Sequence, residues 1–165
     1  MFSEAYRRLV EGQAGLGLVR FEAESNCVAT GRARALLDYC AARRAGRFMP
    51  RAAIRPRELL PLLPHLFIAS LREDDDVYYR LGGTAIVARL GVEVTGRTAR
   101  EIFEPTTAGR IIHCFHAMAE SGEPMTWRGR YYGAGIDDHQ VTEIANVPVL
   151  CKDGRTVQIF GGVFF

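Results

Sequence analysis

The chain has 165 residues, enough for one domain with a single sizeable core, and its apolar and charged fractions of 48% and 24% are ordinary for a soluble globular protein. The net charge is only +2, and the most apolar window, Leu59–Leu71, is too short and too interrupted by prolines to span a bilayer. The first residues lack the order of basic, apolar and small residues of a signal peptide. These features exclude a membrane span and favour a cytoplasmic protein.

Cysteine and arginine placement adds two expectations. The four cysteines are scattered and none lies in a CxxC pair, which predicts unpaired thiols in a reducing compartment. Residues 30–57 hold eight arginines and a single acid, Asp38. Such a cluster predicts either an anionic partner, such as a nucleic acid bound by residues 32–57, or an intramolecular match to the more acidic remainder. Nucleic acid is the weaker alternative, because the sequence shows no recognisable nucleic-acid motif.

Residues 1–29 are the least regular, and we treat them as an N-terminal extension that precedes one domain over residues 30–165. Within the extension, Glu4–Glu11 fits a short helix, and the alternation of Leu18–Glu22 fits a strand.

Residues 30–64 are predicted to form N-terminal helices. Thr30 suits the N-cap of the first helix and Gly46 its C-terminal stop. A second short helix is expected to begin at Pro56, because proline is tolerated at the first helical position. The apolar residues of the first helix recur at helical spacing: Ala33, Leu36, Leu37, Cys40 and Ala41.

Residues 65–165 are predicted to form the core of the domain. Apolar and alternating patterns predict strands at 66–71, 77–81, 125–132, 141–150 and 156–165, and helices at 85–90, 99–103 and 107–121. Asp153-Gly154 predicts a hairpin turn between the last two strands. This order of elements predicts an α+β fold.

The segment Arg80–Gly96 is the most informative part of the chain. A strand ends at Gly82-Gly83, where a Cβ would hinder a sharp turn, a short apolar helix follows, and Thr95-Gly96 ends the unit. This unit resembles the strand-to-helix transition of PAS domains, the small α+β sensory modules of bacterial signalling, and especially a family of short stand-alone PAS-like proteins. The resemblance covers about residues 31–165 and includes four further pieces: Met49–Arg51, Leu63-Pro64, Arg100–Phe103 and Gln158–Gly162.

The resemblance implies an architecture and a place for a ligand. A PAS-like domain has a five-stranded antiparallel sheet with helices on one face, and here an N-terminal helix is available for the other face. The family pattern has a capping aspartate before the proline of the second helix, where this chain has Arg55. In PAS domains the ligand lies between the inner face of the sheet and the long helix, which corresponds here to Phe115 and the strand 125–132.

Polar residues within predicted strands are the candidate ligand contacts. An unpaired buried polar group costs about 1–3 kcal/mol, so each must find a partner, either across the strands or on a ligand. Aromatic residues supply candidate apolar walls, although a plain core has the same composition. The polar candidates are Arg80, Arg128, Glu143, Asn146 and Gln158, with Arg130 in a similar position, and the aromatic candidates are Tyr79, Phe103, Phe115, Trp127, Tyr131 and Phe160.

No catalytic constellation is evident, so the first hypothesis is a non-enzymatic sensory or regulatory module. It would bind a small molecule or a signalling protein. The sequence ends in its last predicted strand, which predicts that the module reports in trans to another signalling protein or to a second copy. A homodimer through the amphipathic helix that carries Leu36, Leu37 and Cys40 is one expectation.

The enzyme and metal alternatives rest on two short clusters. His113 and His116 share a helix face, as a metal pair would, and either could be an axial haem ligand by analogy with some PAS domains; the identity of any cofactor is otherwise unknown. Cys114 beside them is a candidate nucleophile, although neighbours on a helix point apart. Asp137–His139 resembles a metal-site fragment, but a polar hairpin loop is the simpler interpretation.

Overall fold

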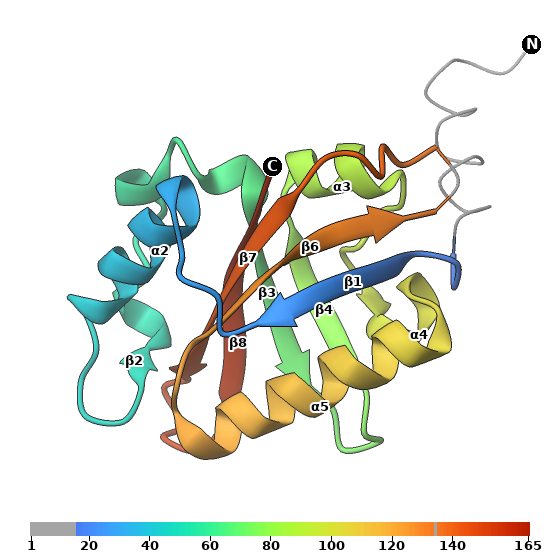
Figure 1. The fold of residues 1–165 in the computed structure, drawn as a ribbon. Helices are drawn as coiled ribbons and strands as arrows, with labels where there is room; N and C mark the ends of the chain where they lie inside the picture. The colour runs from blue at the N-terminus through green and yellow to red at the C-terminus, as the bar shows by residue number, and fades with distance from the viewer. Residues whose placement is uncertain (1–15, 134) are drawn as a thin grey trace, which may run out of the picture.

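The computed structural model describes residues 16–133 and 135–165, and a curled, mainly antiparallel sheet forms its centre (Figure 1). Within these residues the sheet has eight strands in the order β1-β6-β7-β8-β3-β4-β5, with the short β2 paired in parallel to β7. All five strands predicted within residues 65–165 are present, β1 overlaps the strand predicted at Leu18–Glu22, and β2 and β5 are additional. The bounds are β1 Arg20–Ser25, β2 Met49–Pro50, β3 Leu66–Leu71, β4 Val77–Gly82, β5 Arg97–Thr98, β6 Met125–Tyr132, β7 Thr142–Leu150 and β8 Val157–Phe164.

Helices cover both faces of the sheet. α2 packs on β7 and β8 on one side, which we call the outer face, whereas α5 crosses the other side, the inner face, with α4 beside it, and α3 contributes to the same inner core (Figure 1). Each face has its own apolar core, because side chains alternate along the strands. The helices are α2 Gly31–Ala41, α3 Thr84–Leu90, α4 Ala99–Ile102 and α5 Pro105–Ser121, with 3₁₀ turns at Arg51–Ala53, Pro56–Leu59 and Leu63–His65.

β1 adds a strand to the edge of the sheet. It precedes the predicted boundary at residue 30, yet it pairs antiparallel with β6 along its whole length. Gly129 of β6 permits this close pairing, because a Cβ there would lie 1.9 Å from the carbonyl oxygen of Glu22 and 2.7 Å from Cα of Ala23. The side chain of Phe21 is buried on the inner face, which anchors β1 to the core.

The glycine pair at the end of β4 is required because neighbouring atoms leave no room for a side chain. A Cβ on Gly83 would lie 2.2 Å from the carbonyl oxygen of Pro64, and one on Gly82 would lie 1.9 Å from Cγ2 of Val94. The chain therefore turns from β4 into α3 against a backbone that leaves no space for a side chain.

One local prediction is wrong, and a second is confirmed in position but without the capping hydrogen bond. α2 ends at Ala41, and Gly46 lies in the turn that follows, with a φ of 70°. Thr30 occupies the N-cap position, but its hydroxyl donates to the Glu143 carboxylate at 2.8 Å instead of capping the helix. The predicted helix over Glu4–Glu11 lies outside the described residues.

Candidate functional site

Helix α5 is fixed across the inner face by its two ends. Its first residue is Pro105, and the Glu104 carboxylate at the N-cap accepts hydrogen bonds from the first turn, including one from the N–H of Thr107. These bonds, with the Thr107 hydroxyl as the largest contribution, hold the pKa of Glu104 below its ordinary value. Gly122 ends the helix in the left-handed conformation, with a φ of 76°.

The interior beneath α5 is almost filled by stacked rings. Phe115 stacks on Phe67 with ring centroids 6.2 Å apart and on Trp127 at 5.9 Å. The hollow that remains has a volume of about 30 Å³. Small-molecule pockets usually measure roughly 300–1,000 Å³, so this interior is a packed core rather than a ligand pocket.

Six of the eleven predicted ligand contacts surround this hollow. Burial in the core raises the pKa of the Tyr79 and Tyr131 phenols well above their ordinary value, so both stay neutral. The structure brings these six together from β4, the residue after α4, α5, β6 and β7: Tyr79, Phe103, Phe115, Trp127, Tyr131 and Asn146.

The other five predicted contacts, Arg80, Arg128, Glu143, Gln158 and Phe160, do not line the hollow, because they alternate with inner-face residues and so belong to the opposite face. Phe160 is buried in the core beneath α2.

The four polar residues among them find partners outside the inner core. Arg128 forms an ion pair with Glu143, which also accepts from Thr30. Arg80 and Gln158 both donate to the hydroxyl of Ser70 on β3.

Two polar atoms in the inner wall have no hydrogen-bond partner within the described residues. They are Nε1 of Trp127 and Oδ1 of Asn146. Trp127 is 6% exposed and Asn146 is fully buried, although Nδ2 of Asn146 donates to the Met125 carbonyl at 3.2 Å. An unsatisfied buried group of this kind costs about 1–3 kcal/mol.

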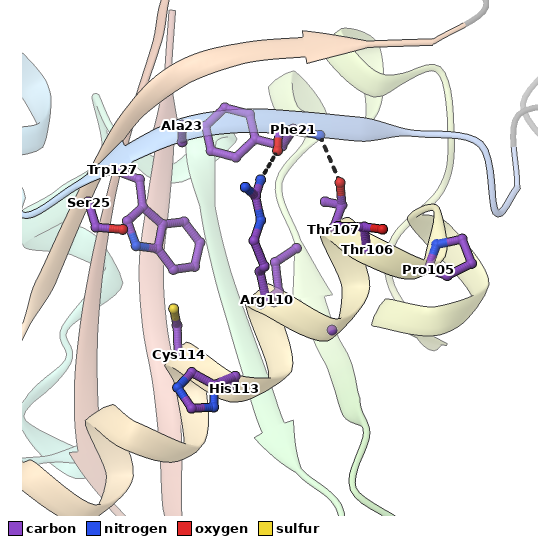
Figure 2. Close-up of a pocket in the computed structure, with 12 residues that line it drawn as sticks. Phe21, Ala23, Ser25, Pro105, Thr106, Thr107, Arg110, His113, Cys114 and Trp127 are labelled. Atoms are coloured by element: carbon purple, nitrogen blue, oxygen red, sulfur yellow. Dashed lines mark hydrogen bonds between the residues drawn. The ribbon is translucent and has the colours of Figure 1, made fainter.

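A larger hollow lies between α5 and β1, and Figure 2 shows its lining. This α5–β1 groove has a volume of about 470 Å³. β1 contributes Phe21, Ala23 and Ser25, α5 contributes residues between 105 and 114, and Trp127 forms part of the wall. Trp127, Phe21 and Ile111 line the inner hollow as well, so a single layer of side chains separates the two spaces.

Two side chains of α5 join the helix to β1 at one end of the groove. The N–H of Phe21 donates to Oγ1 of Thr107 at 3.2 Å, and the guanidinium of Arg110 donates to the Phe21 carbonyl (Figure 2). Both bonds meet at one residue of β1. Further along the strand, Ala23 and Ser25 face the groove.

Among the described residues, the chemistry-bearing side chains of α5 show neither an activated thiol nor a cluster of three metal ligands. Burial raises the pKa of the Cys114 thiol, which disfavours a thiolate nucleophile, and His113 is exposed where it lines the groove. Nδ1 of His116 instead donates to the Ile112 carbonyl at 2.9 Å. Across residues 16–133 and 135–165, no three metal-ligating side chains come together, and a hollow of about 30 Å³ does not fit a porphyrin.

The loop that carries Asp137–His139 is a polar turn. The Asp137 carboxylate accepts from the N–H of His139, and its carbonyl accepts from the guanidinium of the buried Arg89 on α3. These contacts assign the loop a local structural role.

The fold and the long helix across it define a small α+β module of the sensory type. The PAS domain family matches residues 29–163, and the chain belongs to this family. No curated protein and no solved structure matches the chain. Among the described residues, no helix is long and apolar enough to cross a membrane. β1 lies before the matched residues.

Sequence reasoning missed the part of the site that β1 supplies. Phe21, Ala23 and Ser25 are in the extension, where Leu18–Glu22 was the only strand signal. The alternation of Val19, Phe21 and Ala23 between polar residues points to the observed strand, but it does not show that the strand lies beside α5.

Proposed function

We propose that this protein is a regulatory PAS module without enzymatic activity that acts in trans by binding another signalling protein. Membership of the PAS family supports a sensory or regulatory role in general. The observation that favours a protein partner over an internal small molecule is the filled interior, with a hollow of about 30 Å³. A ligand between α5 and the sheet would first have to separate Phe115 from Trp127.

The absence of enzymatic activity is part of the proposal. It is supported by the raised pKa of the Cys114 thiol and by the turn hydrogen bonds of Asp137. Neither arrangement places a base beside an activated nucleophile.

The arginine-rich segment supports intramolecular pairing over nucleic-acid binding. Three of its arginines form ion pairs with acids, two of them on other elements: Arg34 with Asp38 at 2.9 Å, Arg43 with Glu58 at 2.7 Å, and Arg44 with Glu123 at 3.2 Å.

We also propose a cytoplasmic location.

A homodimer through α2 remains a prediction, but fewer apolar side chains of this helix are free to form its interface than the sequence suggested. Leu36 and Cys40, which we expected to form its surface, are buried against the protein's own sheet. Leu37 is only partly buried and is the remaining apolar candidate on this helix.

The proposed function can be tested in cells with a photo-crosslinking amino acid placed singly at three exposed positions: Ser25, Leu60 and Leu81. We expect a covalent adduct with one other protein from at least one position. Native mass spectrometry of the purified full chain is run in parallel. A tightly held small molecule, with no adduct from any position, would overturn the protein-binding proposal.

A further inference from the structure

The free side of β1 is covered by α5 at only one residue. In an antiparallel pair, the N–H and C=O of one residue point the same way, and successive residues alternate between the partner strand and the open side. Both backbone groups of Phe21 point away from β6, because they bond to Thr107 and Arg110. By this alternation, the N–H and C=O of Ala23 and Ser25 point to the same open side.

The α5–β1 groove lies beside these backbone groups, for which residues 16–133 and 135–165 supply no partner on this side. Ala23 and Ser25 line it, and within the described residues no side chain of α5 bonds to their backbone as Thr107 and Arg110 bond to Phe21. Opposite them, α5 presents Cys114, which is half-buried. An edge with open backbone groups beside an apolar groove has the two features used in strand addition, since the backbone bonds give affinity and the groove receives alternate side chains.

We propose that the α5–β1 groove binds an extended segment of another protein, which adds to the edge of β1 at Ala23 and Ser25. Alternate side chains of that segment rest in the groove against Trp127 and Ile111. This inference rests on the proposed function and specifies its docking surface.

The outer side chains of β1 indicate the charge of the segment. Glu22 and Glu24 are exposed and lie opposite Arg130 and Arg128 of β6. An added strand would place its own side chains on the other flank of each glutamate, where opposite charges are stabilising. The segment should therefore alternate apolar residues, which face the groove, with lysine or arginine, which face Glu22 and Glu24.

The same charges argue against a second copy of this chain as the occupant. The backbone of Phe21 is already bonded to α5, so two antiparallel copies of β1 would have to pair through Ala23 and Ser25. A pair centred on Ser25 would set Ala23 opposite Cys27, whose N–H already bonds to the Thr126 carbonyl, so the remaining registers use Ala23 with Ala23 or with Ser25. A two-fold pair centred on Ala23 sets Glu22 opposite Glu24 of the other copy, and a pair of Ala23 with Ser25 sets Glu24 opposite Glu24. Like charges directly opposite each other are destabilising.

The decisive variant is Ala23→Pro. Proline lacks the N–H that the added strand would use, but the N–H of Ala23 does not bond to β6, and proline is tolerated on an edge strand when its nitrogen faces the open side. Ala23→Ser is the matched control, because it keeps the N–H and adds little volume. Amide hydrogen exchange across β6 and β7 verifies that both variants remain folded.

The probes are two labelled heptapeptides of equal composition, one alternating valine with lysine and the other with its valines and lysines in separate blocks. Fluorescence anisotropy with the full chain measures binding. We expect the alternating peptide to bind better than the block peptide, and Ala23→Pro to weaken its binding about fivefold, as the loss of a backbone hydrogen bond of about 1 kcal/mol implies. Ala23→Ser should bind like wild type, and the double change Glu22→Gln with Glu24→Gln should weaken binding and reduce its salt dependence.

Three results would overturn the proposal. They are equal binding of the two peptides, wild-type peptide affinity in folded Ala23→Pro, and binding of small apolar molecules in the groove when neither peptide binds. If Ala23→Pro does not fold, Cys114→Trp fills the groove from α5 and leaves β1 unchanged, and an unaltered affinity in that variant has the same meaning. Cross-links from Leu60 or Leu81 with none from Ser25 would keep the proposed function and reject this surface.

Discussion

Replacing Gly129 with alanine tests whether β1 depends on close approach to β6. The new Cβ would lie 1.9 Å from the carbonyl oxygen of Glu22 and 2.7 Å from Cα of Ala23. Both are backbone atoms, so no side-chain rotation relieves the contact. β1 must therefore move away from β6, and the α5–β1 groove changes with it.

The magnitude follows from what β1 buries. Phe21 and Val19, the residue just before β1, are 3% and 2% exposed, and a fully buried apolar side chain of this size contributes about 1.5–3 kcal/mol. The two hydrogen bonds between Phe21 and α5 add about 1 kcal/mol each. Complete detachment would thus remove on the order of 5–8 kcal/mol, and a partial shift in Gly129→Ala should lower the free energy of unfolding by about 2–5 kcal/mol.

Amide hydrogen exchange separates this effect from general destabilisation. We expect Gly129→Ala to lose protection at Glu22 and Glu24, which bond to β6, before β7 and β8 lose theirs. Gly109→Ala is the control, because its Cβ would meet nothing within 4 Å and alanine favours the interior of α5 by roughly 0.5–1 kcal/mol. Wild-type protection of β1 in Gly129→Ala, with unchanged stability, would refute the reasoning.

Three further predictions concern other parts of the fold. Gly83→Ala should lower the free energy of unfolding by about 1–3 kcal/mol and with it the urea midpoint, because its Cβ would lie 2.2 Å from the Pro64 carbonyl oxygen; an unchanged midpoint contradicts this. Burial raises the pKa of Glu143, but the hydrogen bonds from Arg128 and Thr30 and the charge of Arg128 together lower it by more. The pKa of Glu143 in the folded chain is therefore below its ordinary value. The resulting stability is present above the ordinary pKa of about 4.3 and disappears as pH falls through the folded pKa. Glu143→Gln should therefore be less stable than wild type at pH 7, with a gap that narrows in acid, and a gap independent of pH would count against the ion pair. Burial raises the pKa of the Cys40 thiol to about 12, so iodoacetamide at pH 8 should label it more slowly than the other cysteines, as mass spectrometry can determine, and rapid labelling of the folded chain would contradict its burial.

The sequence predicted the elements whose patterns are long and clearly bounded. β3 and β6 begin and end at the predicted residues, and α5 differs from its prediction only by the two residues at its start. The predicted strand begins two residues before β1 and ends three residues before β1 ends, because Arg20–Ser25 contains one large apolar residue, Phe21, and the strand is held in place by its pairing with β6. Tertiary contacts, rather than local propensity, fix such an edge strand.

The candidate site was less predictable because strand alternation does not say which face a helix covers. On β8, the neighbours Ile159 and Phe160 are 0% and 1% exposed, so burial on both faces hides the alternation that would separate them. Phe160 was therefore assigned to the wrong core. The volume of the hollow beneath α5 could not be predicted from the sequence either, because it depends on how the rings of Phe67, Phe115 and Trp127 stack.

Trp127 connects the packed interior with the open edge. Its ring stacks on Phe115 in the inner core and forms part of the wall of the α5–β1 groove. A segment seated in the groove would contact this ring directly, and a displacement of the ring would be felt by Phe115 because packed cores transmit strain. Since Trp127 is the single tryptophan of the chain, its fluorescence would report that contact. An edge-binding PAS module of this kind would pass its signal through α5 without admitting a ligand to the interior.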